Sequence, residues 1–435
     1  MKVNNEKSKK SQSKHLKRFK KFIVIFISVI LVYVIVSTSL TLIGLSANRK
    51  KAKSFKAIEY ANRPVYKNYE NGCWNIVSDR DIKIVQLTDV HIGGGYMSTK
   101  KDAMAINAVA AMLTAEKPDL VIVTGDISYP VPFQAGTFNN KSAATLFADL
   151  MEALGVYWTA CYGNHDTELY SYYNREQLTE VYASEEYPHC ILQAGPEDVD
   201  GSGNQIINIV NSDGIITRTL VLFDSHSYVD GDYFGIAWKY DNIHDNQIEW
   251  YKNKITELSK QNEAVINSLE DPEKVEQYKD LKTVKSSAFM HIPLTEYREA
   301  WNEFVDNGYN DTENVKYNYG TVGESGKLVY CGVRDDNLFE TMQELGSTDS
   351  VFCGHDHLNN FSLNYKGINL NYGMSIDYLA YSGISKLGAQ RGCTVLDVSK
   401  DGTLVSSLQN YYQDKYISQY TKEDVTMQIL NENAK

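Results

Sequence analysis

Short apolar runs typical of buried strands recur along this chain, with helical patterns between them. The clearest strand-like runs are residues 82–87, 120–123 and 156–161, and apolar residues at helical spacing fill 102–117 and 143–154. We also expect a hairpin where residues 206–210 and 217–223 are joined across Asp213-Gly214. Strands that alternate with helices predict an α/β layered fold. Because no repeat or low-complexity linker follows residue 63, one large domain is expected.

Charge is distributed very unevenly along the 435 residues. The net charge is −12, from 43 Lys+Arg and 55 Asp+Glu, yet residues 1–63 carry +13 and the remainder carries −25. Because residues 64–435 are so acidic, they would repel the phosphate backbone of a nucleic acid. We therefore expect no nucleic-acid partner. An anionic substrate would have to be attracted by something other than net charge, and bound metal ions would serve.

Residues 22–47 contain no charged side chain and are rich in Ile, Val and Leu. As a helix rising ~1.5 Å per residue, this run reaches about 39 Å, enough to cross a ~30 Å hydrocarbon layer with tilt. Leu45-Ser46-Ala47 would suit signal cleavage, but the apolar core of a signal peptide is usually only ~7–15 residues long. We therefore expect an uncleaved single-pass anchor in the cell membrane, and secretion after cleavage is the alternative.

Nine Lys or Arg residues precede the apolar run, and five follow it within residues 49–56. This modest bias favours a cytoplasmic N-terminus and a catalytic domain outside the cytoplasm. The expected division is a basic cytoplasmic arm (1–21), a transmembrane anchor (22–47), a linker (48–79), a folded domain (80–400) and a C-terminal strand or tail (401–435).

The six cysteines form no CxxC pair and no zinc-finger spacing. Cys161 and Cys353 lie in apolar strand-like runs, which favours buried thiols there. We assign no disulfide.

Five strand-like runs end in side chains that can bind metal. In chain order these are Asp89 and His91, Asp126, Asn164 and His165, His291, and His355 and His357. A single histidine is more often a structural residue than a ligand, so the inference rests on the ordered set. Strand ends are where the loops of an α/β fold converge on a site. Imidazole, carboxylate and amide ligands without thiolate suit manganese, iron, zinc or nickel, and eight such groups suffice for two ions sharing a carboxylate.

These residues resemble the ordered motifs of the calcineurin-like metallophosphoesterases over about residues 80–398. The matching strings are Asp89-Val-His91, Gly125-Asp126, Gly163-Asn164-His165-Asp166, Met290-His291-Ile292-Pro293 and Gly354-His355-Asp356-His357. His291-Ile-Pro-Leu-Thr-Glu296-Tyr297 and Gly354-His-Asp-His-Leu-Asn359 look closest to the purple-acid-phosphatase-like branch.

The resemblance implies a fold and a ligand set. The fold is of the α/β class, with two mixed β-sheets packed face to face and flanked by helices in four layers, here preceded by one transmembrane helix. Asp89, His91 and His357 would bind one of two divalent or trivalent ions (Mn, Fe or Zn), and Asn164, His291 and His355 the other. Asp126 would bridge them.

The same resemblance implies a chemistry. Two ions ~3.5–4 Å apart hold a hydroxide that attacks phosphorus and clamp the phosphoryl oxygens. His165 would face the substrate as a catalytic residue and give a proton to the leaving oxygen. Asp166 is the second expected catalytic residue and would hold the ring of His165 in place. The alternative, that Asp166 is a solvated carboxylate of the loop, has equal weight.

Three further groups have competing interpretations. Tyr129 has the spacing of the tyrosine that binds ferric iron in purple acid phosphatases, but His91 stands where those enzymes have glycine, so packing is favoured. Asp224-Ser225-His226 contains the residue types of a hydrolase triad, but neighbouring side chains on an extended chain point to opposite faces, which favours a turn. Arg391 is a candidate phosphate contact.

The sequence therefore predicts a two-metal phosphoesterase that hydrolyses a phosphate monoester or diester. The alternatives are a degenerate surface binding module and a dinuclear hydrolase of a non-phosphate bond. The motifs do not name the substrate, the metal pair or the oligomeric state.

Overall fold

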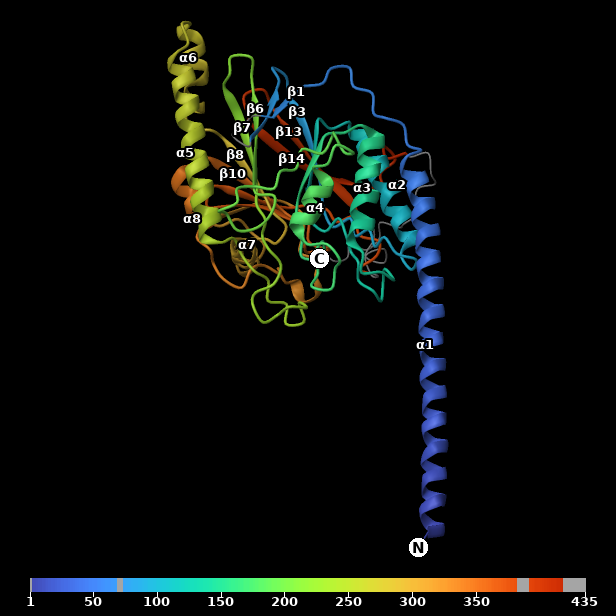
Figure 1. Cartoon of the computed structure of the whole chain (residues 1–435). Coiled ribbons are helices and arrows are strands. Elements are labelled where there is room, and N and C mark those ends of the chain that lie inside the picture. The colour runs from blue at the N-terminus through green and yellow to red at the C-terminus, as the bar shows by residue number, and fades with distance from the viewer. Residues whose placement is uncertain (1, 69–72, 382–390, 418–435) are drawn as a thin grey trace.

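The computed structural model describes residues 2–68, 73–381 and 391–417, and its body is built on two mixed β-sheets (Figure 1). The smaller sheet has the order β14-β13-β3-β4-β5. Its strands are β3 (Ile82–Leu87), β4 (Leu120–Thr124), β5 (Trp158–Cys161), β13 (Gly392–Val398) and β14 (Leu404–Asn410). β3, β4 and β5 are parallel, whereas β13 and β14 add as antiparallel strands.

The larger sheet has the order β1-β2-β6-β7-β8-β10-β12-β11-β9. Its strands are β1 (Val65–Asn68), β2 (Cys73–Val77), β6 (Gln205–Val210), β7 (Ile216–Leu222), β8 (Ser286–Phe289), β9 (Val315–Tyr319), β10 (Thr348–Cys353), β11 (Ser362–Tyr365) and β12 (Ile368–Tyr372). β7, β8, β10 and β12 are parallel neighbours, so their carboxyl ends emerge on one edge. β6 and β7 form the predicted hairpin.

Alternate residues of the strands face two different cores. Ile82, Ile84 and Ile122 of the smaller sheet pack against Phe289 and Phe352 of the larger sheet. The opposite face of each sheet is covered by helices, with α2 (Thr99–Glu116) and α3 (Asn140–Leu154) on the smaller sheet and α5 (Asp245–Asn267), α7 (Thr295–Asp306) and α8 (Leu338–Leu345) on the larger. The four-layer α/β sandwich expected from the sequence is therefore confirmed.

Other short helices connect these layers. They are α4 (Arg175–Tyr182), α6 (Pro272–Tyr278), η1 (Lys279–Leu281) and η2 (Ser325–Lys327). All six cysteines are buried and unbridged, as expected for Cys161 and Cys353.

The folded body begins earlier than the expected boundary at residue 80. β1 and β2 fall within the stretch 48–79 that we expected to be a linker, and they extend the larger sheet through pairing of β2 with β6. Asn75 interrupts the apolar run of β2, so the sequence pattern does not mark it as a buried strand. At the other end, β14 falls within the expected tail, and residues 418–435 lie outside the described residues.

α1 (Lys2–Ala52) contains the apolar run and leaves the body as a long single helix (Figure 1). Within it, residues 15–52 include a window of mean hydropathy 2.8 that is not buried against the body, so it is long and apolar enough to cross a membrane. Its last turns pack on α2 and α3: Asn48 donates to the carbonyl oxygen of Thr99, and Arg49 and Lys53 pair with Asp149. Some of the basic residues that follow the apolar run thus join α1 to the body.

Candidate metal centre

Five loops at the carboxyl ends of strands bring the predicted ligands to one end of the body. Asp89 and His91 follow β3, Asp126 follows β4, Asn164 follows β5, His291 follows β8, and His355 and His357 follow β10. The backbone φ is positive at Asp89, His91, Asp126 and His355. Non-glycine residues keep this left-handed conformation only where the surrounding structure holds it. These turns therefore direct the side chains into one space.

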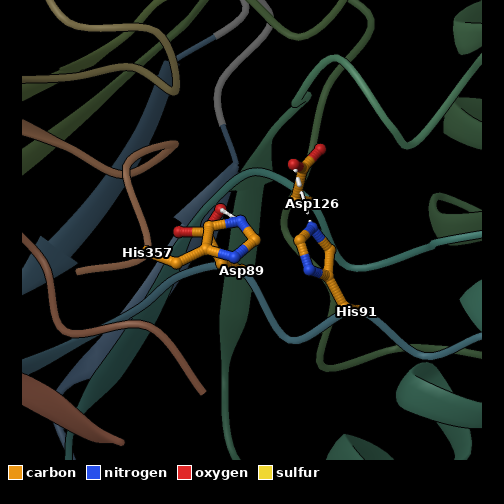
Figure 2. A group of neighbouring side chains, drawn as sticks. All are labelled: Asp89, His91, Asp126 and His357. Carbon is orange, nitrogen blue, oxygen red and sulfur yellow. Dashed lines mark hydrogen bonds and ion pairs between the residues drawn. The ribbon is translucent and has the colours of Figure 1, made fainter. Parts of the chain in front are cut away.

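Four of the side chains surround a single point (Figure 2). One ligand atom from each of Asp89, His91, Asp126 and His357 lies within 4.8 Å of the other three. Nε2 of His91 is 3.0 Å from Oδ2 of Asp126, and Nε2 of His357 is 3.4 Å from Oδ1 of Asp89. Two ligands held ~2.1 Å from one ion at a right or tetrahedral angle are about 3.0–3.4 Å apart. The spacing fits a shared cation.

The other three predicted ligands lie on the far side of Asp126. Nε2 of His291 is 3.1 Å from Oδ1 of Asn164 and 3.3 Å from Nδ1 of His355. The same nitrogen is 3.3 Å from Oδ2 of Asp126, the oxygen that also faces His91. Asp126 therefore lies between both groups, where a carboxylate can bridge two ions.

The hydrogen bonding of this cluster fits metal ions. Oδ1 of Asp89 is buried and accepts no hydrogen bond from any residue that the structure describes. Nδ1 of His291 faces the carbonyl oxygen of Thr124 at 2.8 Å, which places the ring proton on Nδ1 and a lone pair on Nε2. That nitrogen faces the oxygens of Asn164 and Asp126, so it binds either a metal ion or, in the metal-free protein, a proton.

The electrostatics of the cluster also favour a cation. Burial alone would lower the pKa of His91, but the carboxylates of Asp377 and Asp126 raise it to about 9. Burial likewise opposes a charged His291, but Asp126 raises its pKa to about 9. Burial would raise the pKa of Asp126, yet the neighbouring His291 and His165 hold it well below the usual range. The buried carboxylates thus create a site of strongly negative potential.

A family model for the calcineurin-like phosphoesterases matches residues 82–359, which include every candidate ligand. The match spans more than half of the chain. The chain belongs to the calcineurin-like phosphoesterase family.

Three curated proteins and one solved structure illustrate the similarity. "Probable inactive purple acid phosphatase 28" of Arabidopsis thaliana is 25% identical to this chain over 70% of this chain and 72% of its own length. "Probable inactive purple acid phosphatase 29" of Arabidopsis thaliana is 27% identical over 73% of this chain and 77% of its own length. Phosphatase DCR2 of Saccharomyces cerevisiae is 26% identical over 73% of this chain and 53% of that protein. A dimetal phosphatase from Danio rerio aligns with 77% of this chain and 98% of its own, at 11% identity and a TM-score of 0.47. The family-model match confirms the resemblance drawn from the motifs at the level of the family.

His165 lies at the edge of this calcineurin-like site, with its side chain one-quarter exposed. Its backbone N–H donates to Oδ1 of Asp126 at 2.8 Å, which fixes the loop against the bridging carboxylate. Its ring nitrogen Nδ1 lies 2.7 Å from Oε1 of Glu168, a residue that we did not predict. Glu168 is buried and holds the ring so that Nε2 is left for a substrate.

Asp166 does not hold the ring of His165, which corrects the role expected for it. Its carboxylate instead accepts backbone N–H groups from Asp126, Ser128 and Gly163, at 2.8–2.9 Å. The side chain of Asp166 turns into the protein beneath the loops, whereas the longer side chain of Glu168, two residues further on, reaches the ring of His165. Asp166 therefore ties the loops after β4 and β5 together.

Asp377 is a second functional candidate that the sequence did not reveal. Its Oδ1 is 3.2 Å from Nδ1 of His91, and its Oδ2 is 3.3 Å from Nδ1 of His357. Both rings thus present Nε2 to the ligand cluster, and one fully buried carboxylate orients both. Backbone N–H groups of residues 379–381 also donate to Asp377 and stabilise its charge.

Arg391 serves this carboxylate's loop rather than the substrate. The side chain is 3% exposed, its Nε donates to the carbonyl oxygen of Asp377, and its guanidinium lies over the ring of Tyr378. A direct phosphate contact by Arg391, which we had considered, does not agree with this burial.

The ring of Tyr129 packs against two histidines of the site. Its ring centroid lies 4.8 Å from those of both His91 and His165, and burial, with Asp377 and Asp126 nearby, raises the pKa of its hydroxyl. These contacts agree with the packing role expected for Tyr129.

Asp224-Ser225-His226 is a turn, as expected. Asp224 pairs with Arg175 and accepts the backbone N–H of His226, while Nε2 of His226 faces Gln247 at 2.9 Å. Ser225 Oγ accepts the backbone N–H of Ile292. These contacts do not form a proton relay.

Proposed function

We propose that this chain is a metal-dependent phosphoric ester hydrolase that uses two ions of Mn, Fe or Zn and acts on a phosphate monoester or diester. The observation that carries the proposal is the placement of Oδ2 of Asp126 between two complete groups of ligands, 3.0 Å from His91 and 3.3 Å from His291. We assign Asp89, His91 and His357 to one ion and Asn164, His291 and His355 to the other. When bound, such a pair of ions activates water and neutralises phosphoryl charge.

The chain's own residues supply the remaining chemistry in this proposal. His165 stands outside the ligand groups with Nδ1 on Glu168, so its Nε2 is placed to give a proton to the leaving oxygen. The phenol of Tyr228 accepts a hydrogen bond from Nδ2 of Asn164 at 3.0 Å and so directs Oδ1 of Asn164 toward His291. Tyr240 packs edge-on against the ring of His355 and shields it from water.

A non-catalytic binding protein is the second candidate, because the similar Arabidopsis proteins bear names that call them probably inactive. Every motif position is filled in this chain, and the geometry brings the ligands together, which favours the enzyme. A dinuclear hydrolase of a non-phosphate bond is the third.

We further propose that α1 anchors the protein in the cell membrane, with residues 1–21 in the cytoplasm and the catalytic domain outside. The support is the length and hydropathy of the helix and the excess of basic residues before it. Removal of the helix as a signal sequence is the alternative.

The experiment is a substrate panel on the purified full-length protein. Metal is removed with a chelator, and chromogenic phosphate monoesters, diesters and amides are then offered with and without Mn²⁺. Hydrolysis of a phosphate ester that requires the metal supports the proposal. Hydrolysis of amides alone would support the third candidate, and metal uptake without turnover of any compound would support the second.

A further inference from the structure

The metal centre and the membrane-directed part of α1 lie at the same end of the molecule. The strands β3, β4, β5, β7, β8 and β10 all deliver their loops to the end where α2 begins. α1 passes that end and continues beyond the body toward the N-terminus (Figure 1). The teal loop after β4 and the yellow-green loop before α5 form the lower rim of the body in this view, on the side toward which α1 extends.

Contacts between α1 and the body fix the position along the helix at which the loops of the metal centre lie. The backbone N–H of Tyr96 donates to Oγ1 of Thr41 at 3.1 Å, and the hydroxyl of Tyr96 lies 3.2 Å from that of Tyr33. Gly44 allows the close approach, because a Cβ there would lie 2.3 Å from Oγ1 of Thr99. The loop that begins at the ligand His91 therefore meets α1 at Thr41.

The length of helix between Phe22 and Thr41 places this contact at a membrane surface. Residues 22–41 form 20 residues of helix, or ~30 Å, which is the thickness of a hydrocarbon layer. If Phe22 marks the inner boundary, just after Lys20 and Lys21, the outer boundary falls at Thr41. The backbone of Tyr96 would then lie at the headgroups, where tyrosine and tryptophan are enriched, and its side chain, which contacts Tyr33 further along α1, would extend into the hydrocarbon layer.

The rim of the metal centre is apolar at this end. Most large apolar side chains that the described residues outside α1 leave exposed belong to loops around the site. Phe133, in the loop after β4, is 89% exposed, and Ile236, in loop 227–241, is 81% exposed. The rim also exposes Phe138, Leu169, Tyr172 and Trp238. Phe133 lies beside the α1 contact, because Ala135 in the same loop accepts the backbone N–H of Met97.

We propose that these loops rest on the membrane that α1 enters, and that the site acts on phosphate groups carried by lipids of that membrane. The substrate part of this inference rests on the proposed phosphoesterase activity. A body with a charge of −25 after residue 63 is not attracted to an anionic bilayer, so the contact is apolar and held by α1. Apolar side chains scattered singly over a surface need no explanation, but here they gather in loops at one end of the body, beside an anchor that brings lipid to them. This arrangement favours contact with a bilayer.

Site-directed fluorescence tests the contact without reference to activity. The six native cysteines are buried, so an added surface cysteine can be labelled selectively with an environment-sensitive dye. Labels at Phe133→Cys and Ile236→Cys, in full-length protein in phosphatidylcholine nanodiscs, should emit at shorter wavelength and be quenched by lipids brominated on the acyl chains. The matched control is Val405→Cys, an equally apolar position that is 63% exposed near the start of β14, at the opposite end of the smaller sheet. Emission typical of water at all three positions would overturn the contact.

A turnover ratio tests the substrate class. The full-length protein is offered phosphatidic acid and phosphatidylglycerol in vesicles, alongside a soluble chromogenic monoester and diester. The double variant Phe133→Glu and Ile236→Glu should lower the ratio of lipid to soluble turnover by about tenfold, since charge resists entry into the interface, whereas Val405→Glu should leave the ratio unchanged. Turnover of soluble esters but of neither lipid would overturn the substrate class alone. No turnover of any ester with metal present would instead overturn the proposed function, and the fluorescence result would still decide the contact.

Discussion

Asp377 orients two candidate ligands at once, which makes it the most informative residue outside the recognised motifs. It lies 3.2 Å from Nδ1 of His91 and 3.3 Å from Nδ1 of His357, so both rings are fixed by one carboxylate. Partners of this kind set the tautomer and basicity of a ligating histidine. Their loss weakens metal binding without removing a ligand.

We expect Asp377→Asn to weaken metal binding by about 10–100-fold, because the amide cannot accept from both rings as a carboxylate does. Titration of the metal-free protein with Mn²⁺, followed by calorimetry, measures the change. Asp397→Asn is the control, since Asp397 is exposed on β13. An affinity equal to that of the unsubstituted protein would show that Asp377 is structural only.

His165→Ala should lower kcat by about 10²–10⁴-fold and leave the metal content unchanged, because the proposed role of this residue is to donate a proton and not to bind an ion. Glu168→Gln should lower kcat by a smaller factor with little change in KM. His189 and Glu152 form a comparable pair away from the site, with Nδ1 2.6 Å from Oε2, and Glu152→Gln and His189→Ala are matched controls. Loss of metal from His165→Ala would make it a ligand.

The motifs predicted side chains that follow strands directly, and missed those that act through another side chain. Asp89, Asp126 and His291 each end an apolar run, so their convergence follows from the sheet. Glu168 stands three residues after His165, a spacing at which two side chains can meet. Asp377 has no such signal, because its partner His91 is more than 200 residues away and follows a strand of the smaller sheet, whereas its partner His357 follows a strand of the larger sheet.

At the scale of elements, Asp166 joins the loop after β4 to the loop after β5. Its carboxylate accepts three backbone N–H groups that burial hides from water. These bonds hold the left-handed turn at Asp126, which in turn places the bridging carboxylate. The loops are therefore held from below, independently of any ion.

Asp166→Ala should destabilise the fold by at least about 2 kcal/mol, because a buried donor left without a partner costs ~1–3 kcal/mol. Urea unfolding of the metal-free protein measures this free energy, so that metal binding does not contribute. Asp198→Ala, at an exposed loop position, should change it by less than about 0.5 kcal/mol. Equal stability of both variants would refute this role.

Strong periodicity decided which elements could be predicted. β3, the β6–β7 hairpin and α2 were expected within a few residues of their bounds, because long apolar patterns specify them. β1 is a short edge strand, and β2 lies between it and β6. The pairing of β2 with β6 is a tertiary effect that the chain pattern alone does not show. α7, which begins four residues after His291, was not predicted, because polar residues make up much of its sequence. Its apolar face consists of Tyr297, Ala300, Trp301 and Phe304.

At the scale of the whole molecule, the contacts of α1 explain why basic residues also follow the apolar run. Those residues had made the charge bias across the expected membrane span only modest. Arg49 and Lys53 lie 3.5 Å and 3.3 Å from the carboxylate of Asp149, so these cations serve the junction with α3. The nine basic residues before the apolar run then remain as the orienting charge.

We predict that a membrane-impermeant maleimide labels Val405→Cys in intact cells, and labels Ser8→Cys only after lysis, because the proposed topology has the body outside and the arm 1–21 inside. Retention of both positions in membranes after alkaline extraction would show the anchor to be uncleaved. The native cysteines are buried, so the unsubstituted protein is the control for background. Labelling of Ser8→Cys in intact cells would reverse the topology, and absence of the arm from the mature protein would show a signal peptide.

Metal stoichiometry tests the central claim most directly, since everything else depends on seven side chains holding two ions around Asp126. Metal-free full-length protein is titrated with Mn²⁺, and bound metal per chain is counted by elemental analysis. We predict two ions per chain, and one ion for Asn164→Ala, which removes a ligand of only one group. Uptake of no metal, or of a single ion by both proteins, would contradict the account.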